Sequence, residues 1–255
     1  MSLINVFNKA IIACTPRNFY LKSKLANGAY VLGKNMPGFG GRGVFIDGDQ
    51  IEPELWALEN FIDKGDVFID IGANTGVYTM KAAKSLDGTG TVIACEPFVG
   101  VFESLIRSVE YNKFSNVRLR NLCIGARREL RRFYMNFNKP NSFSLSQFDD
   151  KASYVEVLAI SLDDLVKWEK LDRLSYIKID AEGAEEDILL GSQEAIKKFR
   201  PIIQLEVETV YDKINTMLPD YSCFMAPNSP NCLLIPDKHS KIDVPAKLGW
   251  NRHLD

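Results

Sequence analysis

The sequence has few of the residues and runs that define several large classes of protein. Its five cysteines stand at irregular spacing and form no Cys-x-x-Cys pair, which argues against a disulfide framework or a zinc site and favours reduced thiols. Its two histidines have no partner at metal-ligand spacing. The longest apolar runs are far shorter than the roughly 18 residues that a membrane span requires. We therefore expect no metal centre, no membrane partner and a cytoplasmic location.

An excess of charge of one sign is also missing. Lys and Arg total 31 and Asp and Glu total 33, which gives a formal net charge of −2. This balance argues against a nucleic-acid partner held by a basic surface. No repeat, low-complexity segment or linker divides the 255 residues, a length at which one α/β domain can bury a sizeable core.

Residues 1–65 are predicted to form an N-terminal extension of a β-hairpin and a helix. The Asn27-Gly28 pair between apolar segments predicts a hairpin of residues 19–25 and 29–32. After a Gly-rich connector, residues 44–46 predict a further short strand. A helix then begins at Pro53 and ends at Lys64-Gly65.

Residues 66–255 are predicted to form the main domain of a single globular unit, because strand and helix alternate from residue 66. The predicted strands are residues 67–71, 91–95, 117–123, 175–179 and 201–207. Helical spacing predicts helices at residues 75–86, around Phe102, Ile106 and Val109, and from Ala184 onward. This alternation is typical of βαβ units in an α/β fold with a mostly parallel sheet, whose ligand crevice lies at the carboxyl ends of the strands.

The alternation stops between residues 126 and 160. Residues 130–137 and 154–160 are predicted to pair as strands around a polar loop, Asn138 to Lys151. This β-rich insertion, between the third and fourth core strands, would lie above the crevice. Two apolar stretches near the end of the chain, 221–225 and 232–235, predict an added antiparallel edge.

The most informative segment is Asp-Ile-Gly-Ala-Asn-Thr-Gly, residues 70–76, at the end of the first core strand. A dinucleotide site requires Gly-x-Gly-x-x-Gly, but this chain has Asp70 and Thr75 at the first and last glycine positions. The Asp70 carboxylate would repel a pyrophosphate by a few kcal/mol. It would instead attract the ammonium and sulfonium groups of S-adenosylmethionine, and the glycines would let the backbone approach that ligand.

A second acid supports the same interpretation. Glu96 ends the next strand, 20 residues after Gly76, where a carboxylate can accept both hydroxyls of an adenosine ribose. Pro97 then turns the chain away and fixes the carboxylate at the rim of the crevice. Either acid alone has a plain structural interpretation, Asp70 as a helix cap and Glu96 as a solvated strand-end acid. Together, on consecutive strand ends, they favour the cofactor.

With these residues the chain resembles the FkbM family of S-adenosylmethionine-dependent methyltransferases over most of residues 60–210. The resemblance rests on residues 70–76, on Glu96-Pro97, on Ser-Leu-Asp-Asp-Leu at 161–165 and on residues 176–185. It implies a class I methyltransferase (Rossmann-like) fold and O-methylation of a hydroxyl on a sugar or secondary metabolite. It also implies the cofactor-binding residues, of which the first four line the methionyl side, Glu96 holds the ribose and Pro97 follows it at the rim: Asp70, Gly72, Asn74, Gly76, Glu96 and Pro97.

Candidate catalytic residues follow the fourth core strand. Asp180 stands at its carboxyl end with Glu182 just beyond, where they could orient or deprotonate an acceptor hydroxyl. A structural role remains open, with Lys178 and Asp180 as a buried pair and Glu182 as a helix N-terminal acid. The same acids, with Glu206 at the end of the next strand, could instead hold a divalent cation.

We therefore predict an S-adenosylmethionine-dependent O-methyltransferase with a small-molecule acceptor. Two alternatives remain open, a nicotinamide-dependent Rossmann oxidoreductase and a non-catalytic cofactor-binding module. Asp163 and Asp164 are predicted to lie in the first turn of a short helix that begins at Ser161.

Overall fold

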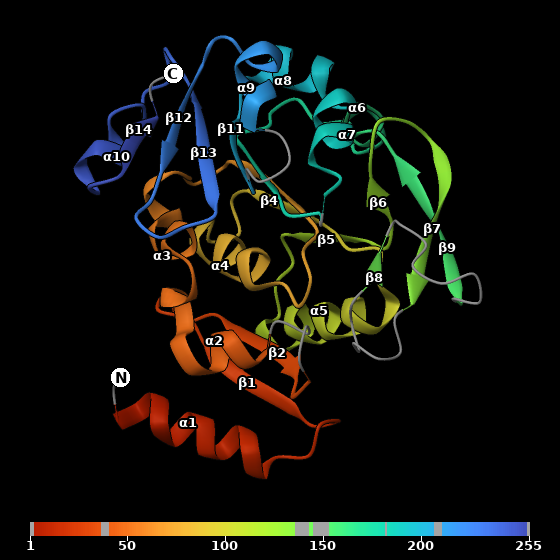
Figure 1. Ribbon diagram of the computed structural model, residues 1–255, viewed down its shortest axis with the longest axis vertical. Helices are drawn as coiled ribbons and strands as arrows, with labels where there is room; N and C mark the ends of the chain where they lie inside the picture. Colours follow the sequence, from red (N-terminus) through yellow and green to blue (C-terminus); the bar gives the residue numbers. More distant parts are fainter. Residues whose placement is uncertain are drawn as a thin grey trace.

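A parallel sheet with an antiparallel edge forms the centre of the protein. The computed structural model describes residues 3–36, 41–135, 143–144, 153–181, 183–206 and 211–253. The strand order is β14-β12-β13-β11-β10-β3-β4-β5 (Figure 1). The parallel strands are β3 (Val67–Ile71), β4 (Thr91–Cys95), β5 (Val117–Arg120), β10 (Tyr176–Ile179) and β11 (Ile202–Glu206). The antiparallel strands are β12 (Tyr221–Met225), β13 (Asn231–Pro236) and β14 (Asn251–His253), which confirms the predicted edge.

Helices cover both faces of this sheet. One face carries α3 (Pro53–Ala57), α4 (Val77–Ser85) and α5 (Val99–Asn112), and α10 (Val244–Lys247) lies near its edge. The other face carries α6 (Leu162–Trp168), α7 (Glu185–Leu190), α8 (Gln193–Phe199) and α9 (Tyr211–Met217). Because β3 and β10 are buried on both faces, their sequences are almost continuously apolar instead of alternating.

The insertion forms a small second sheet at the side of the first (Figure 1). Its strands are β6 (Cys123–Ile124), β7 (Glu129–Met135), β8 (Phe143–Ser144) and β9 (Tyr154–Ile160), in the order β6-β9-β7-β8. The predicted pairing of the two long strands is confirmed, and the pairing is antiparallel. The predicted strand at 117–123 begins at Val117 as predicted, but its end is wrong, because β5 ends at Arg120 and β6 joins the second sheet.

The N-terminal segment packs against α4 and α5. It contains α1 (Leu3–Cys14), β1 (Tyr20–Lys24), β2 (Tyr30–Lys34), α2 (Gly41–Asp47), the 3-10 turns η1 (Gly48–Ile51) and η2 (Leu58–Asn60), and then α3. The β1–β2 hairpin is confirmed, and α1 lies at one end of the molecule (Figure 1).

The predicted strand at residues 44–46 is wrong, because these residues belong to helix α2. The helix packs on the hairpin so closely that a Cβ on Gly41 would stand 2.8 Å from the Cα of Gly33. Val44 is buried in the same contact. A run of three apolar residues is too short for its hydrophobic periodicity to distinguish a helix from a strand. The packing of this segment on the hairpin therefore determines its secondary structure.

Candidate functional site

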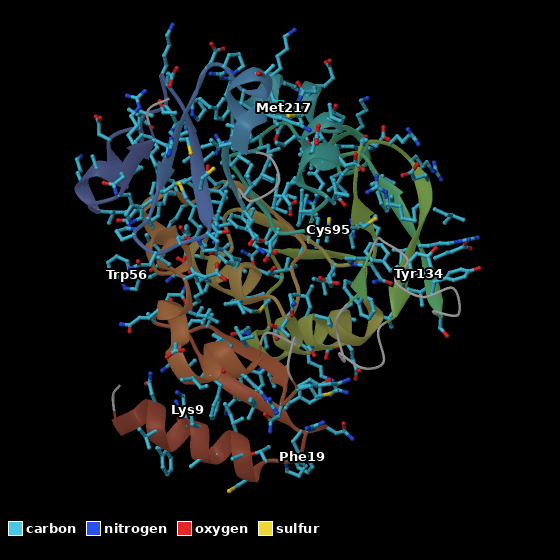
Figure 2. The ribbon with its side chains drawn as sticks, in the orientation of Figure 1. Lys9, Phe19, Trp56, Cys95, Tyr134 and Met217 are labelled. Carbon is cyan, nitrogen blue, oxygen red and sulfur yellow. The ribbon has the colours of Figure 1, made fainter. Side chains whose placement is uncertain are left out.

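The predicted site residues gather where the strand order of the sheet reverses. The chain continues from β3 to β4 on one side, and later adds β10 on the other side of β3. Ligands of open α/β sheets bind at the carboxyl ends of strands at such a point. The turn after β3 is tied to the end of β4, because the backbone N–H groups of Gly72 and Ala73 both donate to the carbonyl of Cys95, at 3.0 Å each. Cys95 is labelled near the centre of Figure 2.

Both glycines of the turn are required by its shape. Gly72 has a φ of +73°, and a Cβ there would stand 1.8 Å from the carbonyl oxygen of Asp180. Gly76 has a φ of +87°, and its Cβ would stand 2.4 Å from a methyl of Leu105 on α5. The first glycine therefore lets β3 and β10 approach each other, and the second lets α4 begin against α5.

Glu96 lies beside this turn and accepts backbone hydrogen bonds on both carboxylate oxygens. The N–H of Asn74, which has a φ of 51°, donates to Oε2 at 2.9 Å, and the N–H of Phe98 donates to Oε1 at 2.8 Å. The side chain is 7% exposed. Burial raises the pKa of Glu96 to about 7 against the opposing effect of these two N–H groups. The structure thus brings together three predicted residues, Glu96, Asn74 and Gly72, around one turn.

Asn121, which the sequence analysis did not single out, holds the Glu96-Pro97 turn in place. The amide Nδ2 of Asn121, just after β5, donates to the carbonyls of Glu96 at 2.9 Å and Pro97 at 3.1 Å. These bonds fix the Glu96-Pro97 turn from the neighbouring strand. An asparagine at the end of a parallel strand was the available signal.

Asp70, which precedes the turn on β3, is buried inside the protein and is not exposed at the surface of the site. It is completely buried, and its Oδ2 accepts from the hydroxyl of Thr79 at 2.5 Å. Its Oδ1 has no hydrogen-bond partner within the described ranges and lies 3.9 Å from the Lys178 ammonium. Burial raises the pKa of Asp70, and Lys178 and Thr79 oppose the rise. A buried carboxylate with one unpaired oxygen favours a positive charge nearby.

Lys178 connects Asp70 to the exposed Asp180. Its buried ammonium lies 3.0 Å from the Asp180 carboxylate and donates to the carbonyl of Gly72 at 3.4 Å. Burial lowers the pKa of Lys178, but Asp180 and Asp70 outweigh it and the net direction is upward. The Asp180 side chain is 47% exposed, so the pair has one buried and one open member. The predicted Lys178–Asp180 pair is present, and the backbone carbonyl of Asp180 lies against the turn that carries Gly72.

A buried chain of hydrogen bonds, which sequence reasoning missed, lies next to Lys178. The Tyr176 hydroxyl donates to Gln204 Oε1 at 2.9 Å, and Gln204 Nε2 donates to the Tyr78 hydroxyl at 2.8 Å. Tyr78 in turn donates to Glu52 at 2.6 Å, and the Lys178 ammonium lies 5.2 Å from the centre of its ring. Glu52 therefore links the N-terminal segment to this group. The signal was Gln204, a polar residue inside an otherwise apolar strand.

Of the other predicted residues, some make contacts that stabilise the fold, and the rest lie outside the described part of the chain. Ser161 Oγ accepts from the N–H of Asp164, as predicted for a helix start, and Asp163 accepts from Glu194 and Ala195 at the start of α8. Glu206 ends β11 opposite Asn231. Glu182 and most of the loop Asn138 to Lys151 lie outside the described residues.

The described residues contain neither a metal-ligand cluster nor a membrane-spanning helix. No group of three or more His, Cys, Asp and Glu side chains in the described ranges could hold a metal ion. No helix in that part of the chain is long and apolar enough to cross a membrane.

The sheet order, the glycine turn and the acid that follows the next strand define a class I S-adenosylmethionine-dependent methyltransferase fold. The family model described as "Methyltransferase FkbM domain" matches residues 70–228. The chain therefore belongs to the FkbM methyltransferase family, and its cofactor is S-adenosylmethionine.

Solved structures show the same likeness at low sequence identity. An FkbM methyltransferase from Methylobacillus flagellatus is 18% identical with a TM-score of 0.49, over 76% of this chain and 52% of that one, so this chain spans about half its length. The precorrin-6y C5,15-methyltransferase of Geobacter metallireducens is 15% identical, with a TM-score of 0.41 over 71% and 84% of the chains. TYW2 of M. jannaschii, solved with AdoMet, is 10% identical, with a TM-score of 0.47 over 86% of each chain. No curated protein matches the sequence.

Proposed function

We propose that this protein transfers a methyl group from S-adenosylmethionine to a hydroxyl oxygen of a sugar or secondary metabolite. The observation that carries the proposal is the position of Asp180, an exposed carboxylate held by the buried Lys178 directly beside the Gly72 turn. An open carboxylate at that place can accept a proton from an acceptor hydroxyl. We keep a cytoplasmic location and a small-molecule acceptor as parts of this proposal.

The residues at the turn fit the cofactor chemically. We propose that Glu96 accepts the ribose hydroxyls with the lone pairs left by its two backbone bonds, with Pro97 at the rim, while Gly72, Asn74 and Gly76 give the ligand access to the backbone. The unpaired oxygen of Asp70 supplies negative charge under the methionyl side. When bound, S-adenosylmethionine supplies a methyl group on a positively charged sulfur, which is already a good leaving group.

The protein's own contribution is then alignment and proton transfer. Asp180 orients the acceptor hydroxyl and takes its proton as the oxygen attacks. Lys178 holds the Asp180 carboxylate in place through its 3.0 Å contact. We propose Glu182 as a second acceptor contact, from its place two residues further on.

Methyl transfer is tested directly with labelled cofactor. The purified protein is incubated with S-adenosylmethionine labelled in the methyl group and with a metabolite extract, and the labelled product is identified by mass spectrometry and NMR. We expect release of S-adenosylhomocysteine and a new methyl ether. Methylation at nitrogen or carbon would contradict the O-methyl assignment. Binding of both ligands with no turnover on any acceptor would favour the non-catalytic module.

Cofactor binding is expected to strengthen as the pH rises from about 6 to 8. With a pKa of about 7, the Glu96 carboxyl of the ligand-free protein is partly protonated at neutral pH. Ribose hydroxyls that donate to the carboxylate favour its ionised form, so binding lowers this pKa and releases a proton. Calorimetric titration of S-adenosylhomocysteine in two buffers of different ionisation enthalpy measures that release.

The matched variant for this titration is Glu96→Gln, which carries no titrating proton. Near pH 7 it should lose the proton release and bind about one to two decades more weakly. Because the ligand's own titration is common to both proteins, their difference reports Glu96 alone. Equal proton release from both proteins would remove Glu96 from the ribose site.

A further inference from the structure

Among the residues that the structure describes, none pairs with the outer edge of strand β1. The N–H of Leu25 donates to Ala29 and the N–H of Asn35 donates to Phe19, both at 2.8 Å, so the odd-numbered residues of β1 pair with β2. In an antiparallel pair the alternate residues then direct their N–H and C=O groups away from the partner. Lys22 is such a residue. Over the ranges that the structure describes, no hydrogen bond reaches its backbone.

The outer edge of β2 shows the opposite arrangement. Its outward N–H groups at Tyr30 and Leu32 donate to Asn112 Oδ1 at 2.8 Å and to Ser108 Oγ at 2.9 Å. Asn112 also donates back to the carbonyl of Tyr30. Side chains of α5 therefore cover the edge of β2. The hairpin is closed on one side and open on the other.

A hollow of about 540 Å³ runs along the open edge of β1. It is lined by Lys22, Ser23 and Lys24. Since consecutive strand residues point to opposite faces, a hollow that touches all three must follow the edge of the strand. Residues 44–50 of α2 and η1 form another part of its lining, with Trp56 of α3. Trp56 is 55% exposed and lies at the periphery of the molecule (Figure 2).

One polar group in this hollow lacks a partner. Ser23 is 4% exposed, and its Oγ makes no hydrogen bond to any described residue. A buried hydroxyl without a partner is unfavourable, and a second hydroxyl on an added strand directly opposite would satisfy it. The hollow therefore presents both an unpaired backbone edge and an unpaired side chain.

Positive charges outnumber the unpaired negative ones in the lining of the hollow, where Lys22 and Lys24 stand against Asp47. The carboxylate of Asp49 is occupied by the N–H of Ala26 and by the buried ammonium of Lys81. Asp47 accepts from the side chain of Asn5. The exposed lysines of β1 are therefore the positive charges that an incoming segment meets. The Lys22 ammonium donates to the Tyr111 hydroxyl at 3.1 Å, and this neutral partner leaves its charge in place.

We propose that β1 binds an extended segment of another polypeptide, which adds to the hairpin as a third strand. Its recognition chemistry is acidic–hydroxyl–acidic, with carboxylates opposite Lys22 and Lys24 and a Ser or Thr opposite Ser23. An apolar residue at the end of the segment packs on Trp56. A second copy of this chain fits less well, because antiparallel pairing centred on Ser23 places lysine opposite lysine.

The test uses the full-length protein and a fluorescein-labelled peptide of sequence Val-Glu-Ser-Glu-Val, with fluorescence polarisation as the readout. We expect saturable binding that weakens with salt. A peptide with Lys for Glu should not bind. A peptide N-methylated at the serine and at both glutamates, which cannot donate to the edge in either strand direction, should bind at least tenfold more weakly.

Variants of the protein locate the binding on β1. Lys22→Pro removes an outward N–H that has no partner in the described structure, so the hairpin keeps its own bonds while peptide affinity falls at least tenfold. The double variant Lys22→Gln, Lys24→Gln should lose the salt dependence. The control Lys167→Gln removes an exposed lysine on the far face of the sheet and should bind normally. Melting temperatures show that each variant is folded.

Three results would overturn the proposal. The first is no saturable binding of the acidic peptide at millimolar concentration. The second is equal binding of the N-methylated peptide, which would mean that the backbone edge is not used. The third is a dimer in sedimentation that Lys22→Pro dissolves, which would make a second copy of the chain the occupant of the edge.

Discussion

Asp180→Asn is expected to lower kcat by about 10²–10⁴-fold and to leave the affinity for S-adenosylhomocysteine nearly unchanged. An amide cannot accept the hydroxyl proton at neutral pH, although it keeps the size of the carboxylate. The fold should tolerate the change. The Asp180 side chain is 47% exposed, and Lys178 keeps the buried Asp70 at 3.9 Å as its second counter-ion. Steady-state kinetics and calorimetry measure the two quantities separately.

The control for this variant is Asp172→Asn, which removes an exposed carboxylate from the loop before β10. It should keep wild-type kcat and affinity, so that a general effect of charge is separated from the effect at the site. Circular dichroism and melting curves are recorded for both variants. A folded Asp180→Asn protein with wild-type turnover would mean that Asp180 does not take the proton, and Glu182 would be the next candidate.

The elements around the site could be predicted from sequence because burial on both faces of a parallel sheet leaves a strong local record. The strand at residues 91–95 has the predicted bounds, and Glu96 follows it as expected. The Asp70–Gly76 turn carries its own signal as well, since a positive φ at Gly72 and Gly76 restricts those positions to glycine. Short-range chemistry therefore determines the position of this turn.

The depth of Asp70 and the partners around it could not be predicted in the same way. Asp70 receives its hydrogen bond from Thr79 on α4 and its nearest cation from Lys178 on β10. The bonds that join Glu52 to Tyr78 and Tyr78 to Gln204 span 26 and 126 residues. Such contacts depend on which elements meet in the fold, and a single sequence has no local pattern for them.

Helix α2 shows the same limit at the level of secondary structure. Its residues carry apolar side chains that suit a strand, but Gly41 packs against Gly33 and the chain there is helical. The tertiary contact overrides a weak local preference. The N-terminal segment is accordingly where sequence-based prediction was least accurate.

Gly72→Ala is expected to cost more stability than any ordinary surface change and to abolish cofactor binding. Two effects add at this position. A φ of +73° disfavours any L side chain by about 1–2 kcal/mol, and the new Cβ would stand 1.8 Å from the carbonyl oxygen of Asp180. That oxygen belongs to the backbone, so β3 and β10 must move apart to relieve the overlap. The movement would displace Asp180 and Lys178 together.

Gly88→Ala is the matched control, because Gly88 has the same φ of +73° with no atom within 4 Å of the added Cβ. This variant should lose only the stability that a side chain at positive φ costs, about 1–2 kcal/mol of unfolding free energy. It should keep its affinity for S-adenosylhomocysteine. Denaturant unfolding and calorimetry on both variants separate the strain of the backbone from the overlap with Asp180. If the two variants lost equal stability and both bound the ligand, the close approach of β3 and β10 at Gly72 would not be needed for the site. We expect instead that Gly72→Ala loses at least twice as much stability as Gly88→Ala, because only there does the added carbon meet the strand that carries the proposed catalytic acid.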